Sequence, residues 1–389
     1  MISVDDAFSI LNKTTFSLQE VDVSLRDAHS FILAETLISP ISMPPFRQAN
    51  MDGFALSLHD QLTYDIVGEI KAGDYFDGQL LPGQAMKIFT GAAVPDSAQA
   101  VIQIEKVTVN NHQLQLQENV NPETNVRPLG SQIEKGTVAL EKGSFLNPAA
   151  IGFLACLGFT SVKVYAKPKV GIVITGNELV QAGQHLPDGK VYDSNSIMLK
   201  VALQSQQYNQ INSYQVEDTF EATKSVLQQA IEENEVILVS GGISVGDYDF
   251  VGKALQSLAV ETLFYKVNQK PGKPLYCGKL QDKMIFALPG NPASSLTCLY
   301  VYVLPTLDRI SGKSVSYSSS ISKSLSHDYE VKNSRSQFLK ALIKGDEVTI
   351  LPHQDSSMLD SYALANALVF VEEGSYLLEK GVKVAVYLL

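Results

Sequence analysis

Three loops rich in glycine and proline, at 240–247, 270–274 and 288–292, hold the residues of this chain best suited to chemistry. The first and third directly follow short apolar runs, which predict buried parallel strands that end at one edge of a sheet, where ligands bind. The loops supply one carboxylate, Asp247, together with two lysines and many backbone N–H groups. This combination indicates a site for an anionic, phosphorylated ligand with a metal ion.

A fourth loop adds a second carboxylate. The apolar run 170–174 ends in Thr175-Gly176-Asn177-Glu178, so we expect Glu178 to reach the same cleft as Asp247. Two carboxylates together with ligand phosphates suit Mg²⁺, which usually takes few protein ligands. Glu178 could instead place its charge in the first turn of a helix, and the spacing leaves the two interpretations even.

The other loop positions also have two interpretations each. Lys270 and Lys273 lie three residues apart between prolines that stiffen the backbone, which suits anion binding, but they could be two solvated surface lysines. The run 240–242 either offers backbone donors to a phosphate or a ring edge, or forms only a tight turn. The run 289–292 is either a rigid wall against a ligand or the start of a helix with proline in its first turn.

Two more glycine-containing loops lie earlier in the chain. Residues 44–55 combine Arg47 and Asp52 on a proline-stiffened segment, and 89–95 is a strand that runs into a glycine loop. Each could be a functional loop or an ordinary linker with a turn. Their own residue types do not decide between the two.

Length and composition limit the other possibilities. At 389 residues the chain predicts two to four domains, and 45% hydrophobic with 18% charged residues is typical of a globular protein. A net charge of −11 without a lysine or arginine cluster argues against nucleic-acid binding. The three cysteines and six histidines lack metal-ligand spacing, which predicts reduced thiols and no zinc site. No apolar run could span a membrane and no signal-type segment is present, so we expect a cytoplasmic protein.

The periodicity of the first 167 residues predicts a helix followed by a β-rich domain. Residues 1–36 are expected to be helical and 40–55 to form a loop. Short strands are expected at 64–68, 85–89, 100–104 and 113–116, followed by a helix at 148–157 and a strand at 161–165.

Alternating strands and helices from residue 168 predict a doubly wound α/β domain. The expected strands are 170–174, 210–216, 236–239 and 284–288, and the expected helices are 195–207, 219–233, 250–258 and 292–310. Asp218 is expected to cap the second of these helices. After a serine-rich linker at 314–324, short strands at 337–343, 347–351, 368–371 and 382–387 predict a small C-terminal β-barrel or sandwich.

Seven segments together resemble the molybdopterin molybdenumtransferase family, which includes MoeA and the gephyrin E domain. In chain order they read PPF…MDGFA, TGAAVP, ITGNEL, VYDSNS, SGGISVGDYD, KPGKPL and LPGNPAS, and they span residues 44–295. The resemblance implies a doubly wound α/β molybdopterin-binding domain, a β-rich inserted domain and a small C-terminal β-barrel. The implied divisions are an N-terminal helix (1–20), a linker or stalk domain (21–40 and 137–167), the β-rich domain (41–136), the α/β domain (168–313) and the barrel (314–389).

The resemblance also implies the last step of molybdenum cofactor assembly. Such an enzyme takes adenylylated molybdopterin and molybdate, releases AMP in a Mg²⁺-dependent step, and places molybdenum on the dithiolene. It implies a homodimer whose cleft lies between the α/β domain of one subunit and the β-rich segment of the other. A molybdopterin adenylyltransferase and apo-molybdoenzymes are the expected protein partners.

Matching motif positions give the site residues that the resemblance implies. The catalytic set is Asp52, Thr90, Glu178, Asp247, Lys270 and Lys273, of which Glu178 and Asp247 would bind the metal. The cofactor-binding set is Ser240, Gly241, Gly242, Pro289, Gly290, Pro292, Arg335 and Ser356. Asp218 also falls on an acidic family position. Because no residue looks like an activated nucleophile, we expect attack by water or by a molybdate oxygen.

Three positions depart from the family pattern. Gln132 replaces a usual acidic residue, Asn177 stands where many members have aspartate, and Asp355 replaces a common glycine. One alternative function is the adenylyltransferase that makes the substrate, which would consume ATP and would not need the N-terminal β-rich domain or the barrel. Another is a non-catalytic scaffold or degenerate paralogue, which would bind the pterin without releasing AMP.

Overall fold

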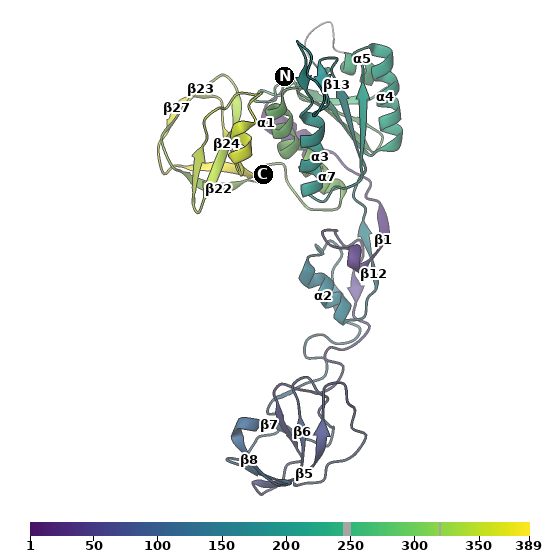
Figure 1. Ribbon diagram of the computed structural model, residues 1–389, viewed down its shortest axis with the longest axis vertical. Coiled ribbons are helices and arrows are strands. Elements are labelled where there is room, and N and C mark those ends of the chain that lie inside the picture. The colour runs from purple at the N-terminus through teal and green to yellow at the C-terminus, as the bar shows by residue number, and fades with distance from the viewer. Residues whose placement is uncertain (244–249, 319) are drawn as a thin grey trace. The chain divides into compact units, whose positions relative to one another are not determined.

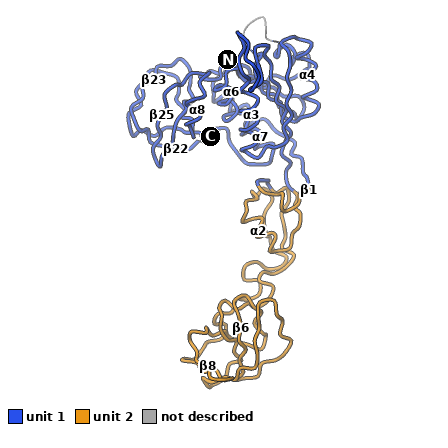
Figure 2. The backbone as a smooth tube through the Cα atoms, viewed as in Figure 1, with its two compact units in different colours: residues 1–21, 30–32, 164–389 blue, residues 22–29, 33–163 orange. Residues whose placement is uncertain are grey.

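The computed structural model describes residues 1–243, 250–318 and 320–389. Its chain divides into two compact units, coloured separately in Figure 2. Unit 1 comprises Met1–Val21, Ser30–Ile32 and Val164–Leu389, and unit 2 comprises Asp22–His29 and Leu33–Lys163.

A six-stranded sheet lies at the centre of the α/β part of unit 1 (Figure 1). Its order is β16-β13-β17-β21-β20-β18; the first four strands are parallel, and β20 runs antiparallel to both its neighbours. The strands are β13 (Val170–Thr175), β16 (Ile211–Val216), β17 (Val236–Ser240), β18 (Glu261–Tyr265), β20 (Tyr276–Leu280) and β21 (Lys283–Leu288). The four predicted strands are confirmed. The sequence does not predict β18 and β20, because the edge strand β18 is half exposed and Gly278 and Lys279 weaken the apolar pattern of β20.

Helices cover both faces of this sheet, as a doubly wound fold requires. Alternate residues of β13 separate the two cores: Ile172 packs with one set of helices and Val173 with the other. On the Ile172 face lie α1 (Val4–Lys13), α3 (Asn195–Ser205), α6 (Pro292–Cys298), the π-helical turn η3 (Leu299–Val303) and α7 (Leu304–Ile310). On the Val173 face lie α4 (Phe220–Glu233) and α5 (Phe250–Ser257). The four predicted helices of this domain are confirmed.

The C-terminal part of unit 1 is a closed five-stranded barrel, which decides between the predicted barrel and sandwich. Strands β24, β25, β22, β28 and β26 pair in that order, and β26 pairs back to β24. Their bounds are β22 (Ile321–Leu325), β24 (Ser336–Lys344), β25 (Glu347–Ile350), β26 (Ala367–Val371) and β28 (Lys383–Leu388). The remaining elements of unit 1 are β14 (Leu179–Val180), β15 (Val191–Tyr192), β19 (Gln269–Lys270), β23 (Tyr329–Asn333), β27 (Gly374–Leu378) and α8 (Asp360–Leu364). The linker expected at 314–324 ends earlier, because β22 begins at Ile321 and pairs with β28.

Unit 2 contains a second six-stranded sheet, in the order β7-β4-β6-β5-β9-β8. Its strands are β4 (Gly53–Leu56), β5 (Thr63–Ile70), β6 (Gln84–Ile88), β7 (Ala100–Gln103), β8 (Val107–Asn110) and β9 (Gln113–Leu116). Shorter elements are β2 (Leu37–Ile38), β3 (Gln48–Ala49), β10 (Val126–Arg127), β11 (Val138–Leu140), η1 (Leu25–Asp27), η2 (Ile104–Lys106) and α2 (Pro148–Cys156), with β1 (Glu20–Ser24) and β12 (Ser161–Tyr165) at the boundaries of the unit. The predicted β-rich organisation is confirmed.

The helix predicted over 1–36 is wrong beyond Lys13. A capping box at Ser3 and Asp6 starts α1, and the chain leaves the helix at Thr14 with extended backbone. β-Branched residues favour strand over helix. In residues 20–24 polar side chains alternate with valines, and this segment forms strand β1.

Two local predictions are also wrong. The loop expected at 40–55 contains β3 and the start of β4, because Gly53 lets the backbone approach β7 so closely that a Cβ there would overlap the carbonyl oxygen of Ile102. Asp218 does not cap α4, since Thr219 accepts the hydrogen bond from the N–H of Ala222. Among the described helices, none is both long and apolar enough to span a membrane.

Candidate active site

A pocket of about 410 Å³ opens at the carboxyl ends of β13, β17 and β21 in unit 1. This is the edge at which open α/β sheets bind ligands. The pocket is lined by Thr175, Glu178, Leu179, Val191, Tyr192, Asp193, Ser194, Asn195, Ser240, Gly241, Pro274, Pro289, Gly290, Asn291 and Pro292. It therefore brings together residues from three of the four predicted loops and part of the lysine loop at 270–274.

Asn195, at the start of α3, ties two of these loops together. Its side-chain Nδ2 donates to the Ser240 hydroxyl at 2.8 Å and to the Gly290 carbonyl at 2.7 Å. These two bonds orient the amide, so that Oδ1 is left as an acceptor. Asn195 is only 8% exposed, and its Oδ1 has no hydrogen-bond partner among the described residues.

Thr175 provides a second unpartnered group in the same lining. It is 4% exposed, and its Oγ1 also lacks a hydrogen-bond partner within the described part of the chain. Buried polar atoms are normally satisfied, and leaving one unpaired costs about 1–3 kcal/mol. Two such atoms in one pocket indicate a polar ligand that supplies the missing hydrogen bonds.

Gly241 lines the pocket next to Thr175, and Gly242 follows it in the same turn. Both have positive φ, at +94° and +62°, and a Cβ on Gly241 would lie 2.6 Å from the carbonyl oxygen of Thr175. The run 240–242 is thus a tight turn and also part of the pocket wall. The turn interpretation and the ligand-site interpretation are therefore compatible. The same is true of 289–292, because Pro292 lines the pocket and begins α6 as its first residue.

Glu178 lies on the rim of the pocket with an exposed side chain. It precedes the short strand β14, so the helix interpretation is wrong. The loop is fixed by reciprocal bonds: the N–H of Asn177 donates to Asp218 Oδ2 at 3.2 Å, and the N–H of Asp218 donates to Asn177 Oδ1 at 3.3 Å. Lys190 Nζ also donates to the Asn177 carbonyl at 2.5 Å. Asp218 and Asn177 therefore position Glu178.

The donor set for a metal is small. Asp247 lies outside the described residues, and the described ones contain no cluster of three or more histidine, cysteine, aspartate or glutamate side chains suited to a metal ion. Glu178 and Asp193 line the pocket with carboxylates. A hard-oxygen set of one or two carboxylates is compatible with Mg²⁺ that keeps water and ligand phosphate in its shell.

Lys270 and Lys273 are exposed at the ends of a rigid turn next to the pocket, whose lining includes Pro274. Beneath the turn, the fully buried Gln269 donates to the Pro271 carbonyl at 3.0 Å and accepts a hydrogen bond from the Tyr302 hydroxyl. The ring of Tyr302 packs 5.5 Å from that of Phe8 in α1. A buried network thus holds the two ammonium groups at the surface.

Gly272, in the middle of this turn, should not tolerate a side chain. Its φ is +93°, and a Cβ would lie 2.6 Å from Cys298 Sγ and 2.7 Å from Gln269 Nε2. We expect Gly272→Ala to lower the free energy of unfolding by about 2–4 kcal/mol. Gly345 is the matched control, because it has φ +62° with no atom within 4 Å of its Cβ position. Gly345→Ala should cost only about 1 kcal/mol. Equal losses in urea unfolding would contradict the packing argument.

The barrel contributes Arg335 and Ser356 to the surroundings of this site. Arg335 directly precedes Ser336, which pairs with Gln269 where β19 joins β24 in parallel. The arginine therefore lies just before the strand pair that contains Lys270. Ser356 Oγ accepts a hydrogen bond from Asn291 Nδ2 at 2.8 Å, and Asn291 lines the pocket. Both residues therefore lie in unit 1 with the other predicted cofactor-binding residues.

Asp52 and Thr90 belong to unit 2 and contact each other. Asp52 Oδ1 accepts two hydrogen bonds at 2.7 Å, from the N–H and from the hydroxyl of Thr90. These bonds, the backbone one first, lower the pKa of Asp52, and the charge of Lys87 adds to the effect. The pair joins the MDGFA and TGAAVP segments and keeps the carboxylate ionised.

Removing the Thr90 hydroxyl should raise the pKa of Asp52 part of the way to its ordinary value. A carboxyl with a lowered folded-state pKa stabilises the fold above its unfolded pKa, and this contribution is lost as pH falls through the folded value. In Thr90→Val this loss of stabilisation should therefore begin at a higher pH. NMR titration of the Asp52 carboxyl measures the change in its pKa. Thr124→Val removes a hydroxyl that donates to the Asn121 carbonyl, and it should leave the titration unchanged.

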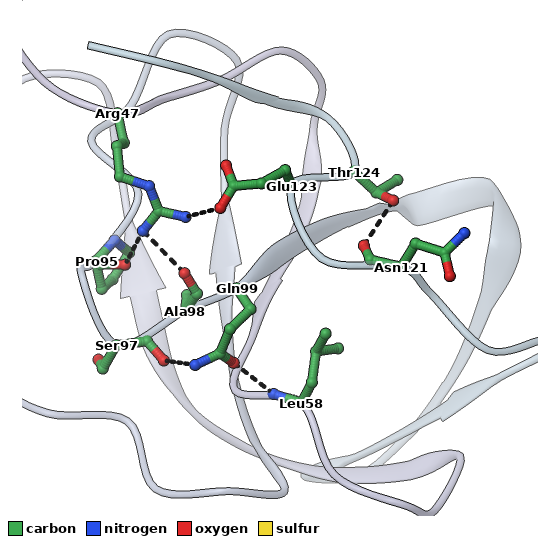
Figure 3. A network of polar contacts seen from close by, with 9 residues as sticks. All are labelled: Arg47, Leu58, Pro95, Ser97, Ala98, Gln99, Asn121, Glu123 and Thr124. Atoms are coloured by element: carbon green, nitrogen blue, oxygen red, sulfur yellow. Dashed lines mark hydrogen bonds and ion pairs between the residues drawn. The ribbon is translucent and has the colours of Figure 1, made fainter.

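Arg47 has a structural role within unit 2. Figure 3 shows its guanidinium between two loops: Nη1 donates to the carbonyls of Pro95 and Ala98 at 3.1 and 2.9 Å, and Nη2 pairs with Glu123 at 3.3 Å. The arginine in segment 44–55 therefore supports the loop after Thr90. Gln132, also in unit 2, has an exposed side chain, and its N–H donates to the Met43 carbonyl.

Three family models match successive parts of this chain. They are the MoeA N-terminal region (domain I and II) at residues 2–158, the "Probable molybdopterin binding domain" at 171–309, which contains the pocket, and the MoeA C-terminal region (domain IV) at 324–389. A molybdopterin molybdenumtransferase of Haemophilus influenzae is 35% identical over 318 residues, which are 80% of this chain and 78% of that protein. This chain belongs to the MoeA family.

Other members of the MoeA family match over nearly the full length. A molybdopterin molybdenumtransferase of Staphylococcus epidermidis is 29% identical over 387 residues, covering 96% of this chain and 92% of its own. Two crystal structures of a molybdopterin biosynthesis MoeA protein from Pyrococcus horikoshii each give a TM-score of 0.83 over 100% of this chain, at 29% and 26% identity. The multidomain fold class expected from the sequence is confirmed.

Sequence reasoning missed Thr175, Asp193 and Asn195 as lining residues of the MoeA-family pocket. A signal for two of them was present, because Asp193 and Asn195 lie in the VYDSNS segment that contributes to the family resemblance. A polar helix start gives no indication of a ligand by itself, since such residues usually cap helices.

Proposed function

We propose that this chain is a molybdopterin molybdenumtransferase that converts adenylylated molybdopterin and molybdate into molybdenum cofactor with release of AMP. The observation that carries the proposal is the glycine-walled pocket in the molybdopterin-binding domain, with two buried polar groups, at Asn195 and Thr175, that no described residue hydrogen-bonds. Oδ1 of Asn195 can only accept a hydrogen bond, and a pterin ring edge is rich in N–H donors. The nearby lysines suit the anionic part of the substrate.

The proposed roles follow the charges. Lys270, Lys273 and Arg335 neutralise phosphate or molybdate oxygens, and the backbone of 240–242 and 289–292 encloses the pterin with Ser356 behind Asn291. Glu178 and Asp247 hold Mg²⁺ or its water shell. When bound, Mg²⁺ supplies charge stabilisation to the phosphate oxygens.

The attacking oxygen in this proposal comes from water or molybdate and not from the protein. Burial raises the pKa of the Cys277 and Cys298 thiols, so neither thiol ionises to become a nucleophile. When water attacks the phosphorus of the AMP group, a new P–O bond forms, the bond to the molybdopterin phosphate breaks, and AMP is released with the molybdopterin phosphate as the leaving group. This displacement requires only positioning and charge neutralisation.

We also propose a cytoplasmic homodimer in which Asp52 and Thr90 of one subunit complete the site of the other. Its support is the family membership and the hydrogen-bonded Asp52–Thr90 pair in unit 2. Delivery by an adenylyltransferase and transfer to apo-molybdoenzymes would be its protein contacts. A monomer in sedimentation at micromolar concentration would contradict the shared site.

The deciding experiment measures AMP release from adenylylated molybdopterin with purified protein, molybdate and Mg²⁺, paired with activation of an apo-molybdoenzyme. We expect release that needs both ions and yields active cofactor. Tight pterin binding without AMP release would indicate a scaffold or degenerate paralogue, and Gln132→Asp would then be tested for recovery. ATP consumption with unmodified molybdopterin would indicate the adenylyltransferase.

A further inference from the structure

Lys340, in β24 of the barrel, is almost completely buried, with 2% of its surface exposed. Its ammonium donates to three backbone carbonyls of one loop: His353 at 2.5 Å, Asp355 at 3.3 Å and Met358 at 3.0 Å. An ammonium has three N–H donors, so these bonds use its full capacity. The loop that Lys340 holds contains Ser356 at its centre.

A second side chain fixes the same loop to the same strand. Gln354 Oε1 accepts from the Lys340 N–H at 2.9 Å, and Gln354 Nε2 donates to the carbonyls of Lys340 and Leu351 at 2.9 and 2.7 Å. The backbone and the side chain of Lys340 are thus both bound to 353–358. The loop has the geometry of a rigid support rather than of a free surface segment.

The other side of this loop faces the wall of the pocket. Ser356 Oγ accepts from Asn291 Nδ2 at 2.8 Å, and the Ser356 carbonyl accepts from the N–H of Ser294 at 3.3 Å. Just beyond the loop, Tyr362 shares a hydrogen bond of 2.6 Å with Thr297 in α6. The contacts hold the start of α6 and the preceding Asn291 from the barrel side.

The charge on Lys340 is required by this arrangement. Burial lowers its pKa, and the carboxylates of Asp355 and Asp360 oppose that change. A neutral amine would lose one donor, and an apolar side chain of equal length would leave three carbonyls without their partner.

We propose that Lys340 is a positioning residue for the transferase site, acting through Ser356 and Asn291 on the wall at 289–292. This inference rests on the proposed function for its kinetic consequence, but its structural part does not. Lys340 itself does not line the pocket. Its effect on the reaction depends on the Ser356–Asn291 contact. In a variant that already lacks this contact, replacing Lys340 should therefore cause no further loss of rate.

The test is a double-mutant cycle with Lys340→Met and Ser356→Ala, read by AMP release and by hydrogen exchange of the peptides 289–295 and 352–359. We expect Lys340→Met to speed exchange in both peptides and to lower kcat/KM by about 10–100-fold, mainly through kcat. The double variant should be no slower than the slower single variant. The proposal would be overturned if the losses of kcat/KM in the two single variants multiplied in the double variant. It would also be overturned if Lys340→Met sped exchange and left kcat/KM unchanged.

Lys323→Met is the matched control. Lys323 is also a barrel lysine, whose Nζ donates to the Gly345 carbonyl at 2.9 Å and to Asp346 at 3.3 Å. It should leave exchange at 289–295 and AMP release unchanged. If Lys340→Met does not fold, Gln354→Ala loosens the same loop and gives the same two measurements.

The two proposals fail in different ways. Absence of AMP release from the unaltered protein would overturn the transferase function, and exchange at 289–295 would still report on Lys340. Exchange at 289–295 that is the same in Lys340→Met and in the unaltered protein would overturn the positioning role whatever the activity.

Discussion

Replacing Glu178 by glutamine should lower the rate of AMP release by about 10²–10³-fold while leaving the fold intact. The two side chains have the same shape, so the packing of Glu178 over Gly176 is retained and only the negative charge is lost. In the proposed reaction that charge binds Mg²⁺ or its water. The measurement is single-turnover AMP release over a range of Mg²⁺ concentrations.

A metal role for Glu178 has a specific signature. The Glu178→Gln protein should need a higher Mg²⁺ concentration for half-maximal rate, because one charged ligand has been removed. Glu221→Gln changes an exposed carboxylate in the first turn of α4, outside the pocket, and is the control. A full rate with an unchanged Mg²⁺ dependence would remove Glu178 from the proposed mechanism.

Asn195→Ala should weaken molybdopterin binding by about 30-fold or more and also lower stability by about 2–3 kcal/mol. The substitution removes the hydrogen bonds that join Ser240 to Gly290 and leaves the Gly290 carbonyl without this donor. It also removes the free Oδ1 acceptor. Binding would be measured by titration of the pterin fluorescence and stability by urea unfolding.

Two further variants separate these effects. Asn195→Asp keeps an acceptor oxygen but loses both donors, so it should retain more binding than Asn195→Ala only if the ligand bonds to Oδ1. Asn212→Ala removes an exposed amide on β16 that donates to Asn234 Oδ1 at 3.0 Å, away from the pocket. It should lower stability and leave pterin affinity unchanged. Equal pterin affinity in Asn195→Ala and the unaltered protein would exclude Asn195 from ligand binding.

The parallel strands and their loops could be predicted from the sequence because each step depends on local residue types. Val170–Thr175 is buried at all six positions and appears in the sequence as one apolar run. Pro292 is the first residue of α6, a position that favours proline. The turn chemistry at 240–242 and 270–274 likewise requires glycine or proline at fixed positions.

The missed features depend on contacts between distant segments. Strand β4 forms in a stretch with prolines and glycine because Gly53 fits against Ile102, a fact that no local pattern contains. Thr175 and Asn195 are ordinary residue types for a strand end and a helix start. They are identified as site residues because each has a buried polar atom with no hydrogen-bond partner in the part of the chain that the structure describes. Ser356 is joined to Asn291 from 65 positions away in the chain.

The support of the lysine turn has a consequence for the order in which the protein can fold. Ile2 pairs with Val267, Phe8 packs on Tyr302, and Gln269 and Lys270 pair with residues 336 and 337 of β24. Contacts of such wide sequence separation form late, because the entropy of closing the intervening loops must be overcome first. During synthesis the turn cannot reach its final form until β24 has left the ribosome, so the cationic part of the site is assembled only after the barrel has begun to form.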